Sequence, residues 1–202
     1  FTSSALSITD LSASGDTIGS GSEPTAVFAV NFIDPTGLGN LTKITVNLAP
    51  AGGATFTNAA LTSSFLENLP LGLQLWRDSG GEGTFDTGDI KLSTQALAQY
   101  SDLGGGVYAY DIELVSALPL SADDTFYVVY QTKDIGVTDD QSVVFSIPAY
   151  GIVTSVSSPV TTAVSAYSIT MDASTPKVVS VIVNGSLDSA GTTIAFNFDQ
   201  SM

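Results

Sequence analysis

The fold class is decided by two neighbouring segments, AVFAVNFI at residues 26–33 and LTKITVNL at residues 41–48. The first is almost wholly apolar, as in a strand that is buried on both faces. The second alternates between apolar and polar residues with one break, which is typical of a strand with one face in a core. Its apolar side is formed by Leu41, Ile44, Val46 and Leu48. Two such segments in succession predict a β-protein.

Seven further segments carry strand patterns and are bounded by loops rich in Gly, Ser and Asp. They are Ala5–Asp10, Leu71–Arg77, Ile90–Ser93, Val107–Leu114, Thr125–Thr132, Ser142–Ala149 and Ala166–Met171. Helical periodicity is confined to Ala59–Leu66 and Thr94–Tyr100, each of about two turns. We therefore predict an all-β fold, an antiparallel Ig-like or jelly-roll β-sandwich of about nine strands.

A domain boundary is predicted at the ASTP segment that ends at Pro176, since a Pro after small polar residues is common in linkers. Residues 1–173 are expected to form the β-sandwich, and residues 174–202 a linker and the first strands of a second Ig-like domain. These strands are Lys177–Val183 and Thr192–Phe198. Two strands cannot bury a core of their own. Either the natural chain continues, or these strands pair with a neighbouring molecule.

Charge and composition exclude several classes of function. The 202 residues include 20 Asp and Glu against 5 Lys and Arg, and the formal net charge is −15. So few cations cannot form the basic patch of a nucleic-acid binder or of a protein that binds an anionic membrane surface. The chain has no His and no Cys, which excludes Ser-His-Asp triads, Cys nucleophiles and zinc sites of the usual kind. Any metal must be a hard cation held by oxygen.

Two further features concern the location of the protein. No apolar run reaches the length of about 18 residues that a membrane span needs. The chain begins at Phe1 instead of Met, as an exported protein does after signal cleavage. An arbitrary starting point of the numbering explains the same observation equally well.

One acidic segment carries a recognisable pattern, DSGGEGTFDTGD at residues 78–89. Acidic residues occupy its positions 1, 5, 9 and 12, and Gly occupies position 6, close to the spacing of an EF-hand calcium loop. However, position 3 is Gly80, position 12 is Asp89 instead of Glu, and the flanks are strand-like. Four carboxylates so close together repel one another unless something compensates them. Arg77 and Lys91 bracket the loop and supply only part of this compensation.

We therefore predict that Asp78, Glu82, Asp86 and Asp89 bind Ca²⁺ through carboxylate oxygens. Thr84 is expected to contribute its backbone carbonyl. The alternative is a solvated, acidic, Gly-rich hairpin loop without a metal, and a catalytic role is disfavoured.

Other acidic pairs are interpreted as structural. Asp123-Asp124 and Asp139-Asp140 are expected in solvated turns, where Asp is favoured. Asp111 and Glu113 share one face of a strand and are expected on a polar outer surface, and not as a glycosidase pair. Asn40 and Asn184 begin triplets that match the N-glycosylation acceptor pattern, which is common by chance in chains rich in Ser and Thr.

The aromatic residues fall mostly at strand spacing. Core packing or cross-strand pairing is therefore expected in preference to stacking on sugar rings. The residues concerned are Trp76, Tyr100, Tyr108, Tyr110, Tyr127, Tyr130, Tyr150 and Tyr167.

Residues 23 to about 152 resemble a β-sandwich module that recurs in large bacterial and archaeal surface proteins. The resemblance rests on AVFAVNF, LTKITVNL and LQLWRDSGGEGTFDTGDIKLS, followed by FYVVYQTK and SVVFSI. The long piece is similar to the module's strand-loop-strand pattern, L-y-x-D-x-G-x-G-x-F-D-x-G-D. The tail TPKVVSVIVNGSLDSAGTTIAFNFDQSM resembles the first half of a bacterial Ig-like domain of the S-layer type, in which P-x-V-x-S-V opens the first strand and I-x-x-x-F-x-x-x-M follows.

Both resemblances imply a structural or adhesive role outside the cell and no catalysis. We therefore expect a non-enzymatic subunit of a prokaryotic cell-surface assembly, such as an S-layer, sheath or filament, whose partners are other copies of itself. Assembly would use Ca²⁺ bridging or strand donation by Ala5–Asp10 or Val178–Val183. The alternative is a carbohydrate-binding or adhesin module that binds cell-wall or surface glycans, and a third possibility is an accessory domain of an enzyme.

Overall fold

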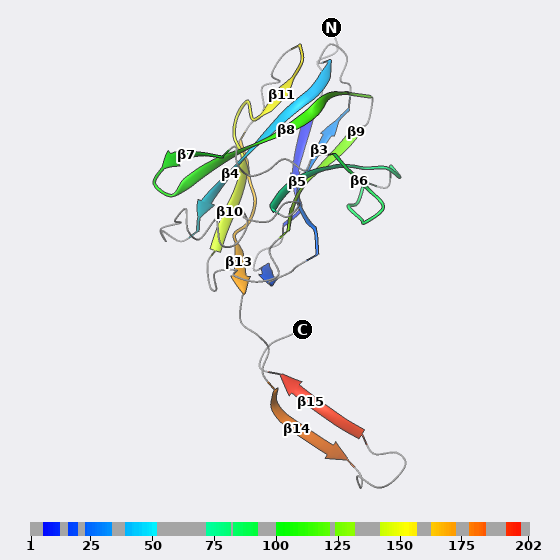
Figure 1. The fold of residues 1–202 in the computed structure, drawn as a ribbon, viewed down its shortest axis with the longest axis vertical. Helices are drawn as coiled ribbons and strands as arrows, with labels where there is room; N and C mark the ends of the chain where they lie inside the picture. The colour runs from blue at the N-terminus through cyan, green and yellow to red at the C-terminus, as the bar shows by residue number, and fades with distance from the viewer. Residues whose placement is uncertain are drawn as a thin grey trace.

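The computed structural model describes residues 6–12, 16–19, 23–33, 39–51, 72–81, 83–92, 100–121, 124–131, 142–156, 163–172, 178–184 and 193–198. In these ranges the chain forms strands joined by turns and loops, and no helix (Figure 1). A helix long and apolar enough to cross a membrane is therefore absent from them.

One sheet has five strands in the order β1-β3-β9-β5-β6, and every neighbouring pair is antiparallel. The segment AVFAVNF lies in β3, beside the centre of this sheet, as its apolar character predicts. The strands are β1 (Leu6–Asp10), β3 (Thr25–Phe32), β9 (Asp124–Gln131), β5 (Gly72–Arg77) and β6 (Ile90–Lys91).

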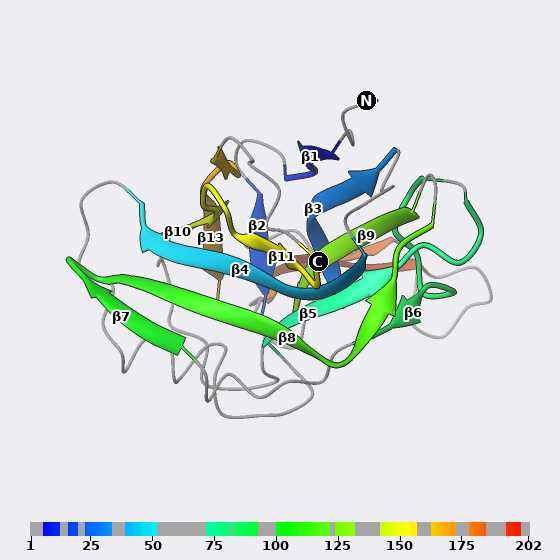
Figure 2. The same ribbon diagram turned by 90° about the horizontal axis from the view of Figure 1, so that it is seen from above.

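The second sheet has eight strands and forms the other layer of the sandwich (Figures 1 and 2). Its main order is β2-β13-β10-β4-β8-β7, while β11 pairs with β4 and β12 with β10. The pair β2–β13 is parallel, and the other described pairs are antiparallel. The strands are β2 (Thr17–Gly19), β4 (Asn40–Pro50), β7 (Tyr100–Gly104), β8 (Val107–Pro119), β10 (Ser142–Ile147), β11 (Ile152–Thr154), β12 (Val164–Ser165) and β13 (Ile169–Asp172).

The core lies between the facing surfaces of the two sheets. Tyr130 of the five-stranded sheet stacks on Phe145 of the eight-stranded sheet, with ring centroids 5.5 Å apart and planes 8° apart. Burial raises the pKa of Tyr130 to about 12. The largest fully buried apolar side chains of this core are Phe28, Phe32, Phe126, Phe145, Leu41, Ile44, Leu48 and Leu75. The predicted all-β, antiparallel sandwich class is confirmed.

Each of the nine segments predicted as strands contains one. The short strands β2, β7, β11 and β12 were not anticipated by the sequence patterns. The candidate helical segment Thr94–Tyr100 is not helical at its last residue, because Tyr100 begins β7. The other candidate, Ala59–Leu66, lies outside the described residues.

The strands β14 (Val178–Asn184) and β15 (Thr193–Phe198) form a separate two-stranded antiparallel sheet. Figure 1 shows this hairpin apart from the two layers. The domain division at residue 173 stays a prediction. Ala5–Asp10 and Val178–Val183 were both expected as unpaired terminal strands for donation. This is wrong, because Leu6–Asp10 pairs with β3 along its full length and β14 pairs with β15.

Candidate functional site

The acidic loop, residues 78–89, connects β5 to β6 at one edge of the five-stranded sheet. Arg77, the last residue of β5, lies opposite Ile90, the first residue of β6. The loop is therefore the closed end of a β-hairpin, as its strand-like flanks predict.

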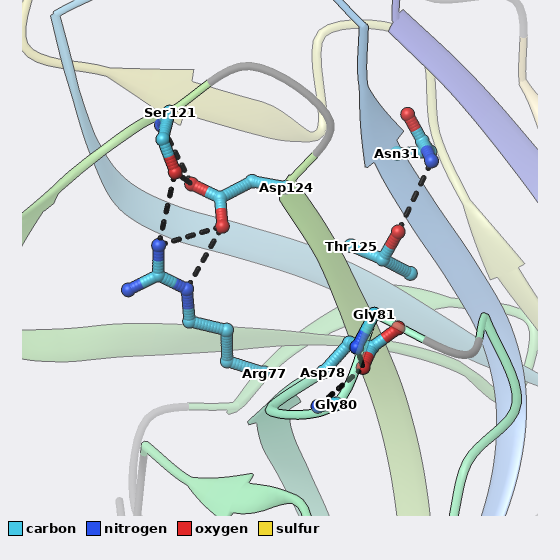
Figure 3. Close-up of polar contacts among 8 residues, drawn as sticks. All are labelled: Asn31, Arg77, Asp78, Gly80, Gly81, Ser121, Asp124 and Thr125. Atoms are coloured by element: carbon cyan, nitrogen blue, oxygen red, sulfur yellow. Dashed lines mark hydrogen bonds and ion pairs between the residues drawn. The ribbon is translucent and has the colours of Figure 1, made fainter.

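Asp78 organises the Gly-rich half of the loop through its carboxylate (Figure 3). Its Oδ1 accepts hydrogen bonds from the backbone N–H groups of Gly80, at 3.1 Å, and Gly81, at 2.7 Å. Its Oδ2 accepts a third from Gly83 at 3.0 Å. Gly81 and Gly83 have φ of 72° and 70°, a region that glycine adopts without strain. These glycines let several amide groups converge on one side chain.

Asp89 closes the loop from its other end and is buried, with 6% exposure. Its Oδ1 accepts a hydrogen bond from the N–H of Ser79 at 3.1 Å, and its Oδ2 from the N–H of Asp86 at 3.0 Å. The Asp86 carboxylate accepts a further bond from the N–H of Gly88 at 2.6 Å. Partial positive charge on backbone amides thus compensates all three described carboxylates.

Phe85 fastens the loop to the outer face of the five-stranded sheet. Its ring makes edge contacts with Trp76 of β5, at 5.4 Å between centroids, and with Tyr127 of β9, at 5.6 Å. Trp76 and Tyr127 are themselves direct cross-strand partners. Lys91 lies over the Trp76 ring at 5.9 Å, and burial lowers the pKa of its amine. The loop is therefore docked on an aromatic platform.

Arg77 does not compensate the acidic loop, in contrast to the expectation. Its guanidinium binds Asp124 of β9, with Nε 2.9 Å and Nη2 2.6 Å from Oδ1 (Figure 3). The second carboxylate oxygen accepts hydrogen bonds from the Ser121 N–H, at 2.6 Å, and the Ser121 hydroxyl, at 2.7 Å. The Asp124 side chain is 7% exposed, so its assignment to a solvated turn is wrong. Asp123 and Asp139-Asp140 lie outside the described residues.

Beside Asp124, Thr125 accepts a hydrogen bond from the side-chain amide of Asn31 at 3.0 Å (Figure 3). This bond links β9 to β3 on the outer face of the same sheet. The ion pair therefore holds the N-terminal end of β9 to β5, and this amide hydrogen bond holds it to β3.

The predicted calcium ligands meet only in part. Asp78, Asp86 and Asp89 share the loop, Thr84 is exposed within it, and Glu82 lies outside the described residues. Nowhere in the described ranges do three acidic side chains gather closely enough to hold a metal ion. The amide bonds above are those expected of the metal-free alternative. Calcium binding stays a prediction, and it requires these carboxylates to exchange amide partners for the cation.

The calcium prediction is tested by titration of the full chain. Heat of binding and a higher Tm are expected at millimolar Ca²⁺, because the cation would offset the repulsion among the carboxylates. Asp78→Asn keeps an acceptor for the glycine amides but removes a charge, and should abolish most of the binding. Asp102→Asn, in the edge strand β7, is the matched control. Absence of heat and of any Tm change in the unmodified chain would favour the metal-free loop.

The outer face of the eight-stranded sheet carries a second polar cluster. Lys43 of β4 forms an ion pair with Asp111 of β8 at 2.8 Å, and the hydroxyl of Thr45 donates to the same carboxylate at 2.6 Å. Burial alone would raise the pKa of Asp111, but the hydrogen bonds from Lys43 and Thr45 and the charge of Lys43 hold it below its usual value. Its expected place on a polar outer surface is confirmed.

The tyrosines divide sharply between core and surface. Four are at most 5% exposed, which confirms their expected packing roles: Tyr108, Tyr110, Tyr127 and Tyr130. Tyr150 and Tyr167 are 59% and 57% exposed. Spacing along the sequence does not predict the exposure of Tyr150 and Tyr167, because neither residue lies in a strand of the structure.

No protein-family model matches the chain, and no curated protein matches it. Among solved structures it is similar to a DUF4466 family protein from Parabacteroides merdae, with a TM-score of 0.31 and 17% identity. That match covers 97% of this chain, which spans 56% of the other protein. It is also similar to the seventh type I cohesin of ScaB from Pseudobacteroides cellulosolvens, with a TM-score of 0.23, 13% identity, and 80% and 91% of the two chains covered. Likenesses this low assign neither a family nor a function.

Proposed function

We propose that this chain is a non-enzymatic, extracellular structural subunit of a prokaryotic cell-surface assembly, such as an S-layer, sheath or filament. The observation that carries the proposal is the β14–β15 hairpin, which exposes apolar side chains and pairs with no other described strand.

The hairpin has one predominantly apolar face. Val181 lies opposite Phe196, and Ile194 shares their face because side chains two residues apart in a strand point the same way. These three side chains are 49% to 56% exposed. The other face is more polar, with Asn197 donating to the Ser180 hydroxyl at 2.7 Å, although Ile182 also lies there. An apolar sheet face of this kind is normally covered by another layer.

The β14–β15 hairpin also lacks the charged residues that protect free edges elsewhere in the molecule. Edge strands invite pairing with other chains unless they are short, charged or irregular. Within the described sandwich the edge strands are short, and three of them carry a charge, namely Asp10 in β1, Lys91 in β6 and Asp102 in β7. Neither β14 nor β15 has a charged residue or a Pro.

Charge supports the same conclusion. Two copies of a chain with a net charge of −15 repel each other over most of their surfaces. The strands β14 and β15 carry no charged residue and so offer a surface at which they can approach. Calcium would reduce the same repulsion, but the proposed role of the hairpin does not depend on the calcium prediction.

The proposal predicts that the full chain self-associates in a concentration-dependent way. Val181→Thr, Ile194→Thr and Phe196→Thr combined should make it monomeric, because they replace the apolar face while Thr still suits a strand. Leu103→Thr, at a 58% exposed position in β7, is the matched control and should leave association unchanged. Light scattering gives the mass of each form. A monomeric unmodified chain over the whole concentration range would contradict the proposal.

A carbohydrate-binding or adhesin module is the second candidate function. The specific observation in its favour is Tyr150, an aromatic side chain that is 59% exposed.

A further inference from the structure

The backbone of Tyr150 adopts a conformation that is unfavourable for any residue with a Cβ atom. Residues 148–151 form a tight turn between β10 and β11, closed by a hydrogen bond from the Gly151 N–H to the Pro148 carbonyl at 2.9 Å. The φ of Tyr150 is 61°, and no other described residue except glycine has a positive φ. Glycine takes this conformation freely, whereas a residue with a Cβ is strained in it.

The backbone of the turn is fixed by a hydrogen bond to β4 and by close packing around Gly151. The Gly151 carbonyl accepts a hydrogen bond from the Thr45 N–H at 2.7 Å. A Cβ at Gly151 would lie 2.9 Å from the Pro148 carbonyl oxygen and 3.1 Å from a methyl group of Ile147. The close packing of this backbone fixes the turn, and the turn fixes the position of Tyr150.

Packing of the Tyr150 side chain does not offset the energetic cost of this backbone strain, since the side chain is 59% exposed. Residues Ile147 and Ile152 on either side of the turn are fully buried in the core. The core contacts at this turn are thus made by Ile147 and Ile152. Stability of the free protein therefore gives no reason for a tyrosine at this position, and strained exposed residues are characteristic of functional sites.

The polar cluster of Lys43, Thr45 and Asp111 lies beside the turn that carries this tyrosine, because the Thr45 N–H is bonded to the Gly151 carbonyl. The strand β11, which follows the turn, pairs with β4 so that Val153 lies opposite Lys43. Beyond β4 comes β8, whose Asp111 binds both Lys43 and Thr45. Two strand spacings, roughly 10 Å, separate β11 from β8. The turn that carries Tyr150 and the ion pair are thus close enough for one short oligosaccharide to reach both.

The chemistry of this cluster favours a neutral ligand with many hydroxyl groups. The positive charge of Lys43 and the negative charge of Asp111 offset each other locally, while the net charge of −15 repels anions. The Asp111 carboxylate still has acceptor capacity, and the Lys43 ammonium has free donors beyond the bond to Asp111. A pyranose ring offers both an apolar face for an aromatic ring and hydroxyls for such groups.

We propose that Tyr150, Thr45, Lys43 and Asp111 form a binding site for neutral carbohydrate. The Tyr150 ring stacks on the sugar, and the Lys43–Asp111 pair hydrogen-bonds its hydroxyls. This deepens the second candidate function by naming its site, and it is independent of assembly through β14–β15.

The test compares the full chain with Tyr150→Gly and Tyr150→Phe on an array of neutral oligosaccharides of glucose, mannose and N-acetylglucosamine. The unmodified chain and Tyr150→Phe should bind the same sugars, and Tyr150→Gly should lose about tenfold or more in affinity. Tyr150→Gly should also raise the Tm by about 2 °C, because glycine relieves the strain. Tyr167→Ala, which removes an exposed tyrosine elsewhere, should keep the binding.

Several results would overturn the proposal. They are no binding by the unmodified chain to any sugar on the array, full binding by Tyr150→Gly, and a fall in Tm of several degrees in Tyr150→Gly. Loss of self-association in Tyr150→Gly would make Tyr150 an assembly contact and would also overturn it. Because light scattering reads assembly separately from sugar binding, failure of this proposal leaves the role of the β14–β15 hairpin standing.

Discussion

Replacement of Asp124 by Ala is expected to lower the free energy of unfolding by about 3 kcal/mol, because it leaves the Arg77 guanidinium without its counter-ion. The carboxylate is 7% exposed and accepts hydrogen bonds from Arg77 and from the backbone and hydroxyl of Ser121. The guanidinium also lies 5.9 Å from the centre of the Phe126 ring, and because the Arg77 side chain is only 29% exposed, water replaces the lost counter-ion only in part. Urea unfolding curves of the two proteins measure the difference.

Two further variants isolate the cause of this loss. Asp102→Ala removes a carboxylate that caps an exposed turn through the Gly104 N–H, and should cost less than about 1 kcal/mol. Arg77→Met combined with Asp124→Leu should recover much of the stability, because both charges are then gone. If Asp124→Ala cost no more than Asp102→Ala, the ion pair would not hold β5, β9 and the preceding loop together as described.

Replacement of Phe85 by Ala is expected to release the acidic loop from the sheet and to lower stability by about 2 kcal/mol. The estimate is below that for a fully buried Phe, because Phe85 is half-buried. Its ring covers Trp76 and Tyr127. Trp76 is the single Trp of the chain, so its fluorescence should shift to longer wavelength when water reaches the indole.

Phe85→Leu is the matched variant for this prediction. It keeps an apolar contact and should preserve most of the stability and most of the emission spectrum. An unchanged spectrum in Phe85→Ala would show that the loop is not docked through this ring.

The alternation of apolar residues was sufficient to predict the sandwich. Segments such as β4 and β10 alternate over several residues, and their buried positions are those that the pattern indicates. The strands that the sequence patterns did not predict are short or irregular. β11 and β12 have three and two residues, too few for a period to show. The sequence YSDLG of β7 lacks alternation, and it is a strand because it pairs with β8 through the Gly-rich turn.

The acidic loop was recognisable from its spacing, but the way its carboxylates are compensated was not. That depends on Gly81 and Gly83 adopting positive φ, which directs amide groups to Asp78, and neighbouring residue types do not reveal it. The partner of Arg77 lies 47 residues away along the chain. The Asp124 carboxylate was assigned to water because Asp is common in turns, whereas the sheet topology brings it beside Arg77.

The most direct test of the proposed function is electron microscopy of the full chain at the concentrations at which light scattering detects association. Ordered filaments or lattices are expected. The Val181→Thr, Ile194→Thr and Phe196→Thr variant should give single particles under the same conditions, while Leu103→Thr should give the same ordered material as the unmodified chain. Single particles alone in the unmodified sample, or ordered material that persists in the triple variant, would contradict the claim that β14–β15 makes this protein an assembling subunit.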